Sequence, residues 1–144
     1  MNKNEIQMFK HQLSDYKEYE RQIEKLKNRL KDIYAQRQAL LYPRIKYGEP
    51  IIENADISNV YMSDQFQRLK SQEDSIMRIV NCYEDLLDIT DSVLSNVPSD
   101  AIRQLLMDIY VNKRPIGVVV LNSHWTDDKS VYRAIRNELK KFDI

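Results

Sequence analysis

The first 42 residues contain neither glycine nor proline, and this absence constrains the fold more than any other feature of the chain. Good helix formers, namely Lys, Glu, Gln, Leu and Arg, dominate the stretch. Apolar residues recur every seven positions in two series set three residues apart, which is the a/d pattern of a coiled-coil seam. The first series is Phe9, Tyr16, Ile23 and Leu30, and the second is Tyr19, Leu26, Ile33 and Leu40. A long helix over about residues 4–42 is therefore predicted.

Such a seam must pack against another apolar surface. That surface is either the same helix of a second chain, in a dimer stalk, or the next helix of the same chain, in a hairpin. We expect a homodimer, because the seam spans residues 9–40 and is longer than a hairpin of this size requires. The residues assigned to this oligomerisation contact are Phe9, Tyr16, Tyr19, Ile23, Leu26, Leu30 and Ile33.

A second long helix is predicted from about Ser63 to Ser95, with Ser63 as its N-cap. Residues 43–62, between the two helices, are predicted to form a connector. They include the turn-forming residues Pro43, Gly48 and Pro50. Pro98 ends the second helix, because proline disfavours helical backbone at the residue before it. We therefore expect a long-helix region at residues 1–97 and a separate domain at residues 98–144.

The C-terminal domain reads as three short helices. Ser99 is placed to cap the first, which runs to about Val111, and Pro115 lies where a proline suits the start of the second. The second helix contains three consecutive valines after Gly117, a pattern that alone would favour a strand. An isolated strand would have nothing to pair with, so we predict a helix there. The chain as a whole is expected to be all-α, with a tri-helical helix-turn-helix unit at its C-terminus.

The last helix, at residues 129–141, separates into two faces. Val131, Ile135, Leu139 and Phe142 form an apolar stripe at helical spacing, with Thr126 or Asp127 available as the cap. The opposite face carries cations and an amide, as expected of a DNA recognition helix or of a solvated charged surface. The candidate DNA-binding residues are Lys129, Ser130, Arg133, Arg136, Asn137, Lys140 and Lys141. Lys129, Ser130, Arg133 and Asn137 are expected at base edges, and Arg136, Lys140 and Lys141 at phosphates.

The distribution of charge is consistent with one focused basic element. The chain carries 22 basic and 22 acidic residues, but residues 129–141 hold five cations and one acid. A neutral total argues against indiscriminate coating of nucleic acid. The chain lacks a glycine-rich phosphate loop, a catalytic serine motif and a zinc-ligand motif, so no enzymatic activity, cofactor or metal is expected. The single cysteine excludes an intrachain disulfide, and no apolar run is long enough to span a membrane, so a cytoplasmic protein is expected.

Two segments together resemble a known family. Residues 110–121 (YVNKRPIGVVVL) and 127–142 (DDKSVYRAIRNELKKF) are similar to the helix-turn-helix of sigma-factor region 4. With the tyrosine-rich helix at residues 16–26 (YKEYERQIEKL), the connector and the long middle helix, the layout resembles the phage ArpU/RinA-type late transcriptional regulators. The resemblance implies a sequence-specific activator of phage late or packaging genes. It also implies double-stranded DNA as a partner, contact with host RNA polymerase, and location in the host bacterial cytoplasm.

Two functional classes remain open from the residues alone. In the first, the chain is a transcriptional regulator that binds duplex DNA through residues 98–144. In the second, it is a helical protein-interaction module, such as a packaging or assembly factor or an inhibitor, whose working surface is the pair of long helices. Salt-sensitive retention on DNA separates the two classes, because phosphate contacts weaken as salt rises.

Overall fold

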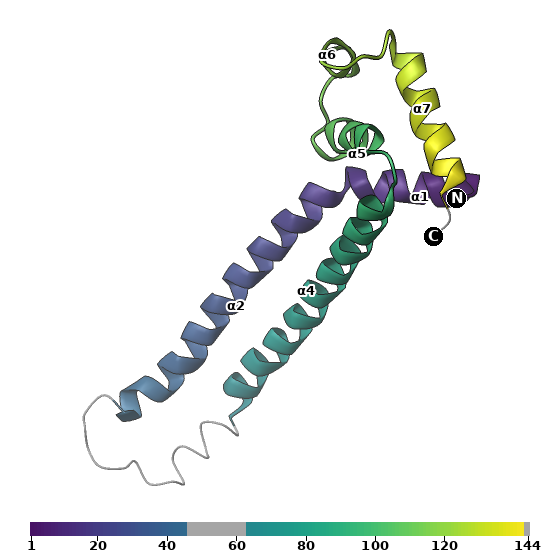
Figure 1. Ribbon diagram of the computed structural model, residues 1–144. Helices are drawn as coiled ribbons and strands as arrows, with labels where there is room; N and C mark the ends of the chain where they lie inside the picture. The colour runs from purple at the N-terminus through teal and green to yellow at the C-terminus, as the bar shows by residue number, and fades with distance from the viewer. Residues whose placement is uncertain (46–62, 143–144) are drawn as a thin grey trace. The chain divides into compact units, whose positions relative to one another are not determined.

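The computed structural model describes residues 1–45 and 63–142, and all regular structure within these residues is helical, which confirms the all-α class (Figure 1). The predicted connector at residues 43–62 lies almost wholly outside the described residues. The elements in chain order are α1 (Lys3–Ser14), α2 (Tyr16–Ile45), α4 (Asp64–Asn96), α5 (Asp100–Leu106), the π-helix η1 (Met107–Val111), α6 (Ile116–Leu121) and α7 (Asp128–Lys141).

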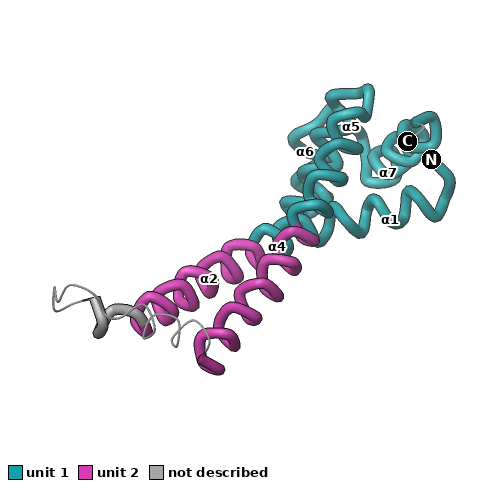
Figure 2. Tube along the Cα trace, turned by 90° about the horizontal axis from the view of Figure 1, so that it is seen from below, with its two compact units in different colours: residues 1–20, 84–144 teal, residues 21–83 magenta. Residues whose placement is uncertain are grey.

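The helices form two compact units (Figure 2). Unit 1 consists of residues 1–20 and 84–144, and unit 2 of residues 21–83. This division differs from the boundary at residue 97 expected from the sequence. Residues 1–20 and the end of α4 belong to the same unit as α5, η1, α6 and α7.

Unit 2 is built by packing α2 against α4 within the same chain. Ile33 of α2 is buried in one cluster with Leu69, Ile76 and Val80 of α4. Four further seam residues pack against this cluster, namely Ile23, Leu26, Leu30 and Leu40. An ion pair between Arg37 Nε and Glu73 Oε2 at 3.0 Å also joins the two helices. The seam therefore has an intrachain partner, and Ile33, which is only 1% exposed, is already covered by α4 of its own chain.

The single helix predicted over residues 4–42 is corrected to two helices that meet at Asp15. The Ser14 hydroxyl donates to the carbonyl of Lys10 at 3.0 Å, and Asp15 closes α1 as its C-cap. Serine and aspartate offer the backbone such local alternatives to a continuous helical ladder. Phe9 consequently leaves the seam and is buried in the core of unit 1, at 3% exposure. Tyr16 packs against that same core, and its hydroxyl donates to Asp91 Oδ1 at 2.6 Å.

The core of unit 1 joins both ends of the chain. Ile6, Phe9 and Leu13 form the buried face of α1. They pack in one cluster with residues from α5, η1, α6 and α7, namely Ile102, Leu105, Leu106, Val111, Val119, Val131, Ile135 and Leu139, together with Met1 and Val97. Two predicted caps are confirmed, because Ser99 accepts from the amide of Ile102 and Asp127 from that of Ser130.

The valine-rich segment is helical, as predicted from its context. The carbonyl of Pro115 accepts from the amides of Val118 and Val119, which starts α6. Val119 is buried, and this burial outweighs the weak helix propensity of β-branched residues. Ahead of the turn, Leu106 at the end of α5 and Val111 at the end of η1 are buried in the same core. A π-helix hydrogen-bonds residues five apart, so it brings these two side chains toward a common face.

The intrachain packing of unit 2 predicts that Ile33→Ala destabilises the protein by about 2–5 kcal/mol, because it leaves a cavity in a fully buried cluster. Ile79→Ala is the matched control, since Ile79 lies on α4 and is 46% exposed. Urea denaturation followed by circular dichroism measures both. Equal losses of stability in the two variants would contradict the packing.

Candidate nucleic-acid interface

Helix α7 is oriented by its apolar stripe. Val131, Ile135 and Leu139 are fully buried, which confirms the predicted core face, and Phe142 packs against the same cluster. Since these residues recur every four positions, they occupy one side of the helix and leave the opposite side to solvent. Helices α5, α6 and α1 all contact α7 within unit 1. The orientation of α7 about its own axis is thus determined by packing.

The opposite face presents the predicted cations. Lys129, Arg133, Arg136, Asn137, Lys140 and Lys141 are all exposed. None of the five cations among them forms an ion pair with another residue in the described ranges 1–45 and 63–142. Basic side chains that stay solvated and outside ion pairs can form charge-assisted hydrogen bonds with an anionic partner. The face therefore has the chemistry needed to contact phosphates and the acceptor edges of bases.

The start of α7 is held by a hydrogen-bonded cap. Asp127 Oδ1 accepts from the Ser130 amide at 2.8 Å and from the Ser130 hydroxyl at 2.6 Å. These hydrogen bonds lower the pKa of Asp127, and the nearby charge of Arg133 lowers it further. Ser130 was predicted as a base contact. Because its hydroxyl already donates to Asp127 within the cap, it can only accept a hydrogen bond from a ligand.

The end of α7 is held by the beginning of the chain. The Met1 ammonium donates to the carbonyl of Leu139 at 3.2 Å and also to that of Phe142. The last carbonyls of a helix have no partner within the helix, and they carry partial negative charge. A cation at this position satisfies both requirements. Figure 1 shows the end of α7 beside the start of α1, where these bonds form.

The structure adds residues of α1 that sequence reasoning missed. Lys3 and Lys10 of α1 line one groove together with Arg136 and Lys140 of α7. Lys10 is half-buried, and its ammonium lies 5.8 Å from the centre of the Tyr110 ring. Burial lowers the pKa of Lys10, and the charge of Arg136 lowers it further. The sequence contained a signal, because positions 3, 7 and 10 are polar and share one helical face, but it could not place that face beside α7.

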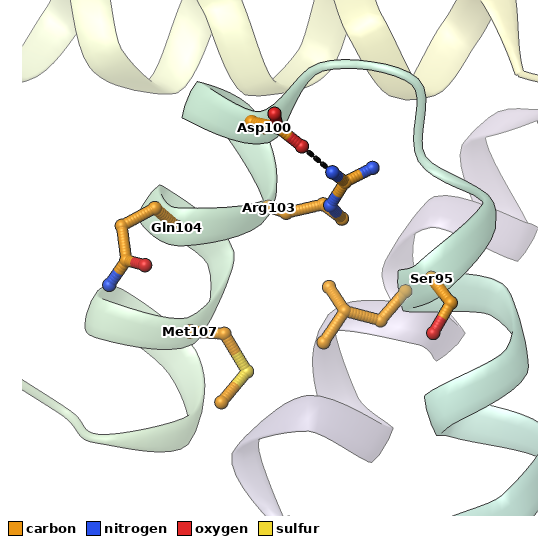
Figure 3. Close-up of a pocket in the computed structure, with 6 residues that line it drawn as sticks. Ser95, Asp100, Arg103, Gln104 and Met107 are labelled. Carbon is orange, nitrogen blue, oxygen red and sulfur yellow. Dashed lines mark ion pairs between the residues drawn. The ribbon is translucent and has the colours of Figure 1, made fainter.

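A second surface pocket lies between the end of α4 and α5, and the charge of its basic residue, Arg103, is neutralised by an ion pair. Arg103 points toward Asp100 and forms an ion pair with it (Figure 3). The guanidinium also donates to the carbonyl of Val97. The other lining residues are Leu94, Ser95, Gln104 and Met107. Arg103 therefore serves to hold the start of α5 rather than to bind a ligand.

Neither a metal-binding cluster nor a membrane-spanning helix is present in the described part of the chain. Among those residues, no group of three or more His, Cys, Asp or Glu side chains is arranged to hold a metal ion. In the same residues, no helix combines the length and the apolar character needed to cross a bilayer.

Comparison of the chain with models of protein families, with curated proteins and with solved structures produced no significant match.

The cap of α7 predicts an acid-sensitive contribution to stability. Because the pKa of Asp127 is lowered from its usual 3.8 by folding, its carboxylate stabilises the folded state above that pH. The contribution is lost as the pH falls through the lowered value. Asp127→Asn keeps an N-cap acceptor without the charge, so it should leave the helix capped and flatten this part of the pH profile.

Thermal unfolding of the native chain and of Asp127→Asn, measured between pH 2 and pH 7, tests this expectation. Asp74→Asn, which neutralises an exposed carboxylate in the interior of α4, is the control. The difference in melting temperature between the native chain and Asp127→Asn should shrink as the pH falls below about 3.8. A difference that stays constant across the range contradicts the assigned role.

Proposed function

We propose that this chain is a sequence-specific DNA-binding transcriptional regulator, and that α7 is its recognition helix. The observation that carries the proposal is the division of α7 into a fully buried apolar stripe and an exposed, unpaired cationic face. A helix held in this way can enter the major groove without disturbing the core. The opposite arrangement, with the cations paired to acids on neighbouring helices, would have left no charge for a phosphate backbone.

The order and spacing of the helices support the same proposal. Helix α5 with η1, then α6, then α7 follow one another with connections at residues 112–115 and 122–127. All three pack into the single core of unit 1. A helix-turn-helix protein uses such a unit to present its last helix to the major groove.

The proposal extends to the class of regulator. On the resemblance of residues 110–142 to sigma region 4, and of the whole layout to the phage ArpU/RinA-type regulators, the chain activates late or packaging genes in the host bacterial cytoplasm. Contact with host RNA polymerase belongs to this proposal. Val118 and Leu121 on α6 are 43% and 84% exposed, and they offer an apolar surface for such a protein contact.

Dimerisation also stays a prediction. Two copies would double the recognition surface, as in many helix-turn-helix proteins. Because the apolar seam of α2 packs on α4 of the same chain, a dimer would have to use another surface. Light scattering at tens of micromolar protein, with and without DNA, distinguishes a monomer from a dimer.

The alternative function is a helical protein-interaction module. It is favoured by exposed large apolar side chains in unit 2, namely Tyr34, Met77 and Ile79. Retention on sheared genomic DNA at low salt, lost as the salt concentration rises, supports the regulator. Flow-through at low salt supports the interaction module. DNA fragments selected by the native chain then supply matched and scrambled duplexes for the binding measurements that follow.

Arg133→Ala tests the reading of bases by α7. Arg133 lies on the exposed side of α7, so its removal should leave the fold intact. We expect a loss of roughly 1–3 kcal/mol on the matched duplex and a flattened preference at one base pair. Fluorescence anisotropy on matched and scrambled duplexes measures both effects. Arg29→Ala, an exposed arginine in unit 2, is the control, and unchanged affinity of the Arg133 variant for the matched duplex refutes the assignment.

Lys140→Ala tests the contact with phosphates. We expect it to weaken binding to matched and scrambled duplexes by the same factor, because phosphates are alike in every sequence. The slope of log affinity against log salt concentration should become shallower by about one unit. Lys70→Ala, an exposed lysine on the part of α4 that lies in unit 2, should change neither quantity. A loss confined to the matched duplex would instead identify Lys140 as a base contact.

A further inference from the structure

The groove between α1 and α7 brings together four cations from opposite ends of the chain. Lys3 and Lys10 come from α1, and Arg136 and Lys140 from α7. Ile6 and Gln7 complete the lining, and neither is charged. The groove lies within unit 1, where the two helices are in contact. Its wall therefore consists of four basic side chains, one amide donor and one apolar side chain.

These cations have no counter-charge in the described parts of the chain. None of the four forms an ion pair with a described residue, and no acidic side chain lines the groove. Like charges held close together repel, and burial strengthens the repulsion because less water screens it. Burial lowers the pKa of the Lys10 ammonium, and the charge of Arg136 lowers it further, so the smaller part of this shift reflects the repulsion. A bound anion would relieve it.

The chemistry of the lining selects the kind of anion. Lysine and arginine are the side chains that bind phosphate most often, arginine through its planar fork and lysine as a compact charge. Gln7 adds a neutral donor. Ile6 is only 6% exposed, because its side chain belongs to the core, so it offers little surface to an apolar ligand. A phosphate group with an extended, solvated remainder fits such an open, basic groove.

We propose that the groove between α1 and α7 is an oxyanion site that holds a phosphate group of the DNA backbone while α7 lies in the major groove. The proposal rests on the proposed function and assigns to α1 a part in it. Arg136 and Lys140 are the residues of α7 expected at phosphates, and they lie on the flank that adjoins α1. Lys3 and Lys10 thus extend the phosphate-contacting surface of α7 onto a second helix.

The test is the salt dependence of duplex binding by a Lys3→Gln/Lys10→Gln double variant. Each phosphate contact contributes close to one unit to the slope of log affinity against log salt concentration. The double variant should lose between about one and two units of slope, with equal effects on matched and scrambled duplexes. Lys17→Gln/Lys70→Gln is the matched control, because it removes two exposed lysines that do not line the groove.

Thermal unfolding shows whether the variant is folded. The double variant should melt at the same temperature as the native chain or higher, since it removes a repulsion. If it melts lower, the single variant Lys3→Gln, at an exposed position, replaces it, and a loss of about one unit of slope is then expected.

A companion titration with inorganic pyrophosphate separates failure of the groove from failure of the proposed function. If the native chain binds no duplex, pyrophosphate should still shift the side-chain amide resonances of Gln7 in the native chain and not in the double variant. That result upholds the oxyanion site and refutes the DNA-binding function. Two results overturn the site: a slope for the double variant equal to that of the control, or no duplex binding together with unmoved Gln7 resonances.

Discussion

Burial of the apolar stripe of α7 is the interaction on which the candidate site depends. Val131, Ile135 and Leu139 are fully enclosed, and each such side chain contributes roughly 1.5–3 kcal/mol relative to exposure. Repulsion between neighbouring like charges on an exposed helix is worth only a few tenths of a kcal/mol per pair. Burial therefore decides how α7 is rotated, and the cations remain together on the outer face even though they repel one another.

The enclosure is completed by α1, from the other end of the chain. Ile6, Phe9 and Leu13 close the core, and the Met1 ammonium satisfies carbonyls at the end of α7, 138 positions away from Leu139. Closing so long a loop costs little more entropy than closing a shorter one, because the cost grows only with the logarithm of length. The packing of α1 places Lys3 and Lys10 beside the cations of α7. A structural contact thus also shapes the electrostatics of the candidate site.

The break at Asp15 shows how tertiary packing selects among local options. Ser14 bonds back to the carbonyl of Lys10, and Thr90 makes the same kind of bond to the carbonyl of Leu86. Helix α4 nevertheless continues through Thr90, whereas α1 ends at Ser14. The local hydrogen bond permits a break without enforcing one. At Asp15 the burial of Phe9 and Leu13 in unit 1 makes the break favourable, although the heptad pattern runs through it.

The sequence by itself determined the features that depend on residues within one helical turn of each other. These are the all-α class, the caps at Ser99 and Asp127, the end of α4 before Pro98, and the two faces of α7. Periodicity and capping act over three or four positions, so they can be read without knowing the fold. Only the tertiary structure decided that the α2 seam packs on α4, that Phe9 leaves it, and that α1 borders α7. An apolar face in the sequence shows that the face will be buried. Because the hydrophobic effect is not directional, the sequence pattern does not show which other surface covers that face.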